Sequence, residues 1–99
     1  MITVEVCLED IESAIAAQLG GANQVELCDN LTVGGTTPSI GLIKLVRQQI
    51  EIDLQVIVRP RGGDFCYTNL EFEVMKSDVE AIKSAGANGI VIGTLKPDA

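Results

Sequence analysis

Four short apolar segments, separated by helical patterns, constrain the fold of this chain more than any other feature of its sequence. They cover residues 2–7, 24–28, 54–58 and 89–93, and all four are rich in valine, isoleucine or leucine. Short runs of this kind are typical of buried strands. Strands that alternate with helices predict a parallel sheet whose connections are right-handed.

The segments between the predicted strands carry signals for helix starts. Asp10 is the expected N-cap of a first helix. Thr37 followed by Pro38 fits an N-cap and the first helical position of a second helix. Thr68 and Glu71 have the spacing of a capping box, which predicts a third helix that runs to about residue 85.

Two architectures fit this order of elements. Strand–helix units of this size build a (β/α)8 barrel of about 250 residues, and residues 1–99 would then form its N-terminal half, a single domain that ends after the fourth strand. The repeated tripeptides 21–23 and 86–88, both Gly-Ala-Asn, also suggest two related βαβα units. The alternative is a complete, doubly wound four-stranded domain. We favour the half-barrel because no helix follows the fourth strand.

Composition excludes several classes of partner. The net charge of -7 disfavours binding to nucleic acid or to an anionic membrane surface. No apolar run approaches the roughly 20 residues that span a bilayer, and the first residues lack the pattern of a signal peptide. We therefore expect a cytoplasmic protein whose three cysteines are reduced thiols. The chain has no histidine, so other side chains would have to serve as bases or metal ligands.

Charged side chains gather on one face of the predicted sheet. Alternation along the strands places Glu5, Glu26 and Arg59 on the face that lines a barrel, and Arg61 continues it. We expect Glu5 and Glu26 to meet the charges of the arginines, since buried guanidinium groups need anionic partners. This cluster is either an anion or metal pocket, with Glu5 or Glu26 as the acid–base residue, or an ion-pair network that fills a barrel interior.

The cysteines predict a metal site. Cys7 and Cys28 are expected at equivalent heights on adjacent strands, where two thiolates can bind a soft ion such as Cu(I). The alternative is that they are ordinary buried thiols, which are usually inert. Cys66, in the loop after Asp64, is a less favoured third ligand.

Several motifs together resemble the CutC family of copper homeostasis proteins. The resemblance runs from about residue 4 to residue 95, and its most specific string is Arg-Pro-Arg-Gly-Gly-Asp-Phe at 59–65. It is also carried by residues 5–7, 25–28, 34–41, 73–78 and 86–93. The resemblance implies a TIM barrel of about twice this length. It further implies a cytoplasmic, often oligomeric copper-binding protein in which Cys7 and Cys28 match the proposed Cu(I) ligands.

Two functions follow as hypotheses. The first is Cu(I) binding through Cys7 and Cys28. The second is an enzyme in which Arg59 and Arg61 hold a small phosphate or carboxylate substrate. The residues leave open whether any reaction is catalysed. With either function we expect homo-oligomers, because a half-barrel exposes two strand edges.

Overall fold

The computed structural model describes residues 1–98, and in them one parallel sheet of four strands forms the centre of the fold. The predicted domain of residues 1–99 therefore extends one residue beyond the described part. The strands follow one another across the sheet in sequence order. They are β1 (Glu5–Leu8), β2 (Gln24–Leu27), β3 (Asp53–Val58) and β4 (Gly89–Ile92).

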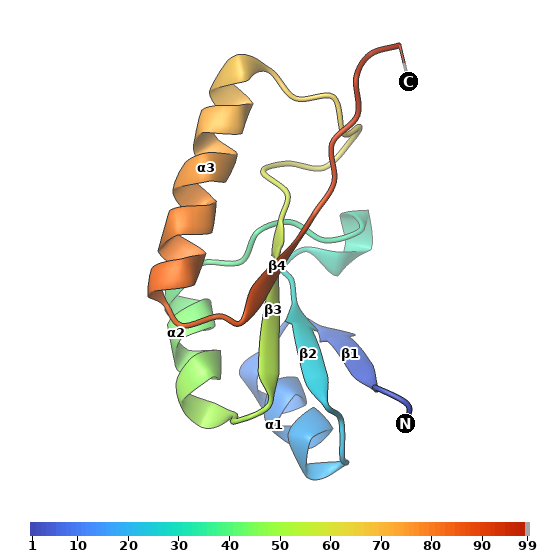
Figure 1. Cartoon of the computed structure of the whole chain (residues 1–99), viewed down its shortest axis with the longest axis vertical. Helices are drawn as coiled ribbons and strands as arrows, with labels where there is room; N and C mark the ends of the chain where they lie inside the picture. The colour runs from blue at the N-terminus through green and yellow to red at the C-terminus, as the bar shows by residue number, and fades with distance from the viewer. Residues whose placement is uncertain (99) are drawn as a thin grey trace.

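Three α-helices lie on one side of this sheet, as Figure 1 shows. They are α1 (Ile11–Leu19), α2 (Ile40–Gln49) and α3 (Asn69–Ser84), and a short 3-10 turn spans Leu31–Val33. A doubly wound sheet places helices on both faces and reverses its strand order. The sequential order and the one-sided helices therefore confirm the barrel half and exclude the doubly wound alternative.

Local signals start two of the helices where the sequence predicts them. Asp10 Oδ1 accepts a 2.7 Å hydrogen bond from the Ser13 amide at the start of α1. At α3, Thr68 and Glu71 form both hydrogen bonds of the predicted capping box.

The predicted start of α2 is wrong by two residues. The N-cap is Ser39, whose Oγ accepts from the Leu42 amide at 3.2 Å. The Thr37 hydroxyl is unavailable for capping because it bonds the backbone of Arg59. It accepts from the Arg59 amide at 2.9 Å and donates to the Arg59 carbonyl at 3.2 Å.

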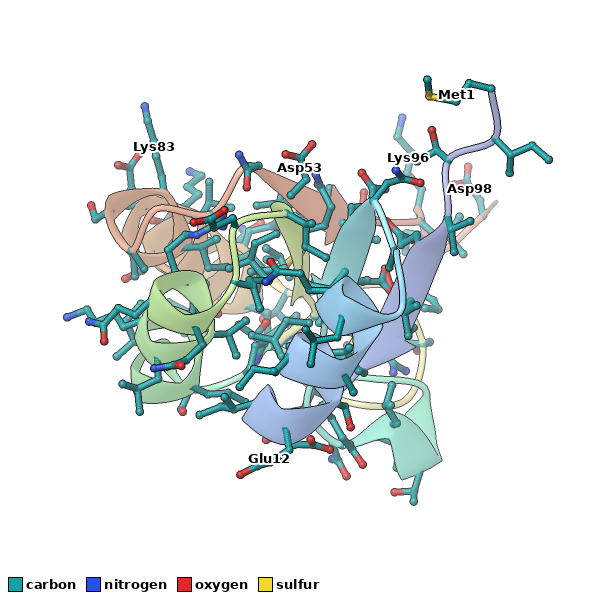
Figure 2. All side chains as sticks on the ribbon, turned by 90° about the horizontal axis from the view of Figure 1, so that it is seen from below. Met1, Glu12, Asp53, Lys83, Lys96 and Asp98 are labelled. Carbon is teal, nitrogen blue, oxygen red and sulfur yellow. The ribbon has the colours of Figure 1, made fainter. Side chains whose placement is uncertain are left out.

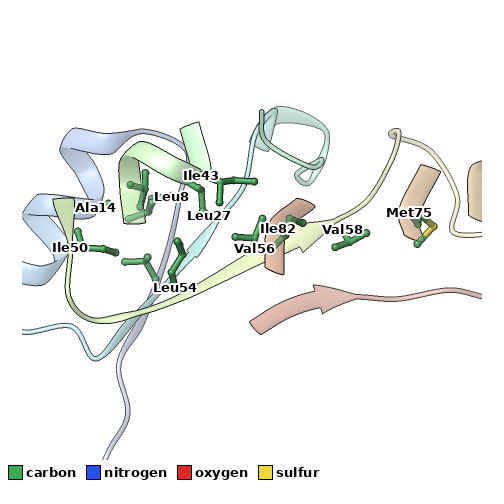
Figure 3. Packing of buried hydrophobic residues seen from close by; sticks show 12 residues of the cluster. Leu8, Ala14, Leu27, Ile43, Ile50, Leu54, Val56, Val58, Met75 and Ile82 are labelled. Atoms are coloured by element: carbon green, nitrogen blue, oxygen red, sulfur yellow. The ribbon is translucent and has the colours of Figure 1, made fainter. Parts of the chain in front are cut away.

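The hydrophobic core lies between the sheet and the helices (Figure 3). Leu27, Leu54 and Val56 point from the strands toward Ile43 of α2 and Ile82 of α3, and each is almost fully buried. The helices do not fully cover the two outer strands of the sheet. Val6 on β1 is 36% exposed, and Ile92 on β4 is 50% exposed.

Two asparagines form the same hydrogen bonds at the amino-terminal ends of the strands, Asn23 between β1 and β2 and Asn88 between β3 and β4. Asn23 donates its amide to the Val4 carbonyl at 2.9 Å and accepts the Val4 amide on Oδ1 at 2.7 Å. Asn88 forms the same pair of bonds with Leu54, both at 2.8 Å. The repeated Gly-Ala-Asn tripeptide thus does the same structural work before β2 and before β4.

Some charged side chains on the helices point away from the core. Figure 2 shows Glu12 on α1 and Lys83 on α3 projecting away from the core. Throughout residues 1–98, no helix is both long enough and apolar enough to cross a membrane.

Candidate metal centre

Two thiols and one carboxylate meet at the carboxyl ends of β1 and β2. Cys7 lies on β1, Glu26 on β2, and Cys28 directly follows β2. Their possible ligand atoms all lie within 4.8 Å of one another. The two Sγ atoms are 3.7 Å apart, and the Cys28 thiol is 3.7 Å from Glu26 Oε1, to which it donates. We call these three residues the cysteine cluster.

The strand register places these residues differently from the sequence prediction. Cys7 is opposite Glu26, and Leu8 is opposite Leu27, so Cys28 lies beyond its expected height. The prediction of equivalent heights for Cys7 and Cys28 is therefore wrong. The thiols still meet because both side chains leave the sheet on the same face, and the Glu26 carboxylate lies beside them.

The loop after β2 folds back over the Cys28 sulfur. Asp29 and Thr36 exchange two backbone hydrogen bonds, of 2.9 and 2.7 Å, which close this loop. Gly35 within it has a φ of 98°, and a Cβ atom there would lie 3.3 Å from Ile57 Cδ1 and 3.5 Å from Cys28 Sγ. Only glycine suits this backbone conformation and this close approach. The loop leaves Cys28 buried while Cys7 stays exposed.

The pKa values of both thiols are raised above their usual range. Desolvation is the largest cause for each, followed for Cys7 by its hydrogen bond with Glu26 and for Cys28 by its hydrogen bond with Cys7. Both thiols are consequently protonated at neutral pH in the metal-free protein. A metal ion that binds the thiolates must displace these protons.

The donor set suits a thiophilic metal ion. Thiolates favour Cu(I) and Zn²⁺ over Mg²⁺ or Ca²⁺, and a carboxylate adds a harder oxygen donor. The residues present thus fit a metal ion bound by Cys7 and Cys28 with Glu26 beside it. The sequence pattern placed Glu26 in an anion or metal pocket, as a possible acid–base residue, and did not assign it as a metal ligand with the two cysteines. Its place two residues before Cys28 puts both side chains on one face and could have indicated this.

The arginines do not meet the carboxylates that the sequence prediction assigned to them. Arg59 is only 7% exposed and donates to three backbone carbonyls: Val33 at 2.7 Å, Gly35 at 2.8 Å and Gly63 at 3.0 Å. The expected contacts of the arginines with Glu5 and Glu26 are absent within residues 1–98. Glu5 instead accepts a hydrogen bond from Gln24.

Arg61 finds its partners within its own loop and the start of α3. Its Nε lies 2.6 Å from Glu71 Oε2, and its Nη2 lies 3.2 Å from Asp64 Oδ1 and 2.9 Å from the Cys66 carbonyl. The hydrogen bond from Arg61 is the largest cause of the lowered pKa of Glu71.

We call residues 59–68 the arginine loop. Cys66 is a half-buried free thiol whose carbonyl helps to hold this loop.

Comparison with known proteins identifies the family. A model of the CutC family matches residues 2–99. The chain belongs to the CutC family. Within it, the chain is 50% identical over 95 residues to the human copper homeostasis protein cutC homolog and 53% identical over 95 residues to the CutC family protein of Chromobacterium violaceum. The CutC crystal structure from Streptococcus agalactiae superposes with a TM-score of 0.93 at 39% identity.

These relatives are longer than the chain. The alignments cover 96% of the chain but 35% of the human protein and 38% of the Chromobacterium protein. The Streptococcus structure is matched over 99% of the chain and 48% of its own length. The described strands and helices therefore correspond to one part of the family fold, and that part contains the cysteine cluster.

Proposed function

We propose that this CutC-family chain binds Cu(I) through the thiolates of Cys7 and Cys28, in the cytoplasm. The observation that carries the proposal is the 3.7 Å separation of the two Sγ atoms, with the Glu26 carboxylate within reach of both. Soft thiolate ligands favour Cu(I). A reducing cytosol keeps both the thiols and the ion in the required state.

Each residue of the cluster has a distinct role in this proposal. Cys7 is exposed and receives the incoming ion, whereas Cys28 is buried beneath the loop that contains Gly35. Glu26 accepts a hydrogen bond from the Cys28 thiol and is a possible third ligand of the ion. Because desolvation raises the pKa values of both thiols, copper binding is coupled to the release of protons.

A Cu(I) competition titration against a coloured chelator, without oxygen, tests this assignment. The wild-type protein should take about one Cu(I) per chain. The Cys7→Ser/Cys28→Ser variant should lose this binding, while the matched control Cys66→Ser should retain it. Equal copper affinity of the double variant and the wild type would contradict the proposal. Glu26→Gln then shows whether the carboxylate contributes as a ligand, through a smaller loss of affinity.

We also propose that the chain associates with itself through β1 and β4. These outer strands each pair with one neighbour, and their outward side chains Val6, Ile90 and Ile92 are 36–50% exposed. Unpaired strand edges and exposed apolar residues favour association. Analytical ultracentrifugation of the chain should show dimers or larger species, and a purely monomeric profile would contradict this.

A further inference from the structure

The guanidinium of Arg59 is a buried cation with no carboxylate partner in residues 1–98. Its hydrogen-bond acceptors are the three neutral carbonyls described above. Such carbonyls solvate the charge in part but do not neutralise it. Burial of an ionised group is costly unless a counter-ion meets it. The electrostatics of this site therefore favour one more negatively charged partner.

The hydrogen bonding of Arg59 is also incomplete. Its Nε is buried and has no acceptor among the described residues, a state it shares only with the Tyr67 hydroxyl there. Buried donors in folded proteins almost always find an acceptor. The charge and the unused donor thus point to the same missing group, an acceptor with negative charge.

A hollow beside Arg59 has room for a small molecule. Its volume is about 180 Å³, and besides Arg59 it is lined by Ile57, Val58, Phe65, Val91, Ile92 and Gly93. It lies at the carboxyl ends of β3 and β4, the end of the sheet where barrel proteins bind ligands. The Phe65 ring, 39% exposed, lies 5.0 Å from the guanidinium carbon and forms one wall.

We propose that this hollow binds a small monocarboxylate, with the carboxylate on Arg59 and a short apolar tail against Ile57 and Val91. A single charge fits best, because the carbonyls of Val33, Gly35 and Gly63 crowd the guanidinium and repel a dianion. The volume lies below the roughly 300 Å³ at which pockets for drug-sized ligands begin, so the tail is only a few carbons long. This site uses neither thiol of the cysteine cluster.

Arg61 has no place in this site. Its guanidinium is already held by Glu71, Asp64 and the Cys66 carbonyl, so the sequence prediction of two arginines clamping one anion reduces to Arg59 alone. A lone guanidinium lined by apolar side chains again favours a carboxylate over a phosphate, which usually binds several donors.

Nitrogen-15 NMR of the Arg59 side chain tests the proposal in the full chain. The chain has three arginines, so Arg47→Lys and Arg61→Lys assign the Arg59 Nε–H signal by elimination even if changes at Arg59 prevent folding. Sodium butyrate should shift this signal in a saturable manner. Butanol, which has the same tail without the charge, should not shift it, and inorganic phosphate should shift it less than butyrate does.

A filled-hollow variant supplies the second arm of the test. Val91→Phe places a larger side chain in the hollow while it leaves Arg59 and its carbonyl partners unchanged, and it should weaken the butyrate response at least tenfold. The proposal would be overturned if butyrate did not change the chemical shift of the Arg59 Nε–H signal, or if butanol changed it as much as butyrate does. So would an undiminished response in Val91→Phe, or a stronger response to phosphate.

Discussion

The cysteine cluster and the arginine loop both consist of polar residues at the carboxyl ends of strands, yet they use their functional groups in opposite ways. In the cysteine cluster, the Cys7 and Cys28 thiols have only weak partners, each other and Glu26, at 3.7 Å. In the arginine loop, Arg61 makes hydrogen bonds to two carboxylates and several carbonyls. Similar positions in a sequence therefore do not imply similar availability for a ligand.

This contrast separates stability from binding. A residue whose donors are mostly used by its own chain contributes to the folded state, and its removal leaves orphaned partners. A residue with weakly engaged ligand atoms contributes little to folding and remains free for chemistry.

Arg59→Gln should destabilise the protein by about 3 kcal/mol, because three carbonyls lose a charged donor that a shorter amide cannot replace. Cys7→Ser is the matched change in the cysteine cluster and should cost less than about 0.5 kcal/mol, since Cys7 is exposed. Urea denaturation of both variants measures the two values. Similar losses in both would remove the distinction between the regions.

Copper affinity should rise steeply with pH between 6 and 8. The pKa values of both thiols are raised, so both are protonated throughout this range and each must lose its proton to bind. Two displaced protons change the apparent affinity by about 100-fold per pH unit. Chelator competition at several pH values, corrected for the chelator's own protonation, gives the slope. A flat profile would show that the thiolates are not the ligands.

The arginine loop should be insensitive over the same pH range. Arg61 lowers the pKa of Glu71 in the folded state, so the stabilisation from this carboxylate is complete above its unfolded pKa of about 4.3. It is lost only as the pH falls through the lower folded value. Between pH 6 and 8, urea denaturation should therefore show no change in stability with pH that depends on Glu71, and the decline should begin near pH 4.

Thr68→Ala should destabilise the protein by about 1 kcal/mol, because the N-cap of α3 is lost. Ser39→Ala, which removes the cap of α2, is the matched control. Thr68 should cost slightly more, because Glu71 joins its capping box to Arg61. Thermal or urea unfolding of both variants decides this, and a smaller loss at Thr68 would mean that the arginine loop does not depend on the start of α3.

The fold was largely predictable because it follows from local patterns. Alternation along β3 places Val56 and Val58 on the face opposite Arg59, and both side chains are buried beneath the helices. The capping signals at Asp10 and Thr68 also acted as expected, since a cap depends only on residues within one helical turn.

The site was less predictable because it depends on register and on loops. Alternation determines which face a side chain is on, but not which residue lies opposite it, so Glu26 rather than Cys28 pairs with Cys7. The partners of Arg59 are backbone carbonyls, which no pattern of side chains reveals. The same interaction network removed Thr37 from its predicted capping role.

The paired asparagines suggest a route for engineering this fold. Asn23 and Asn88 tie the strands together at the end of the sheet opposite both candidate sites. Stability anchored at one rim leaves the other rim free to change. The loops that carry Cys28 and Arg59 could therefore be exchanged for loops from other barrel proteins to build new binding sites. The hydrogen bonds of Asn23 and Asn88 would be kept, so that the sheet stays intact.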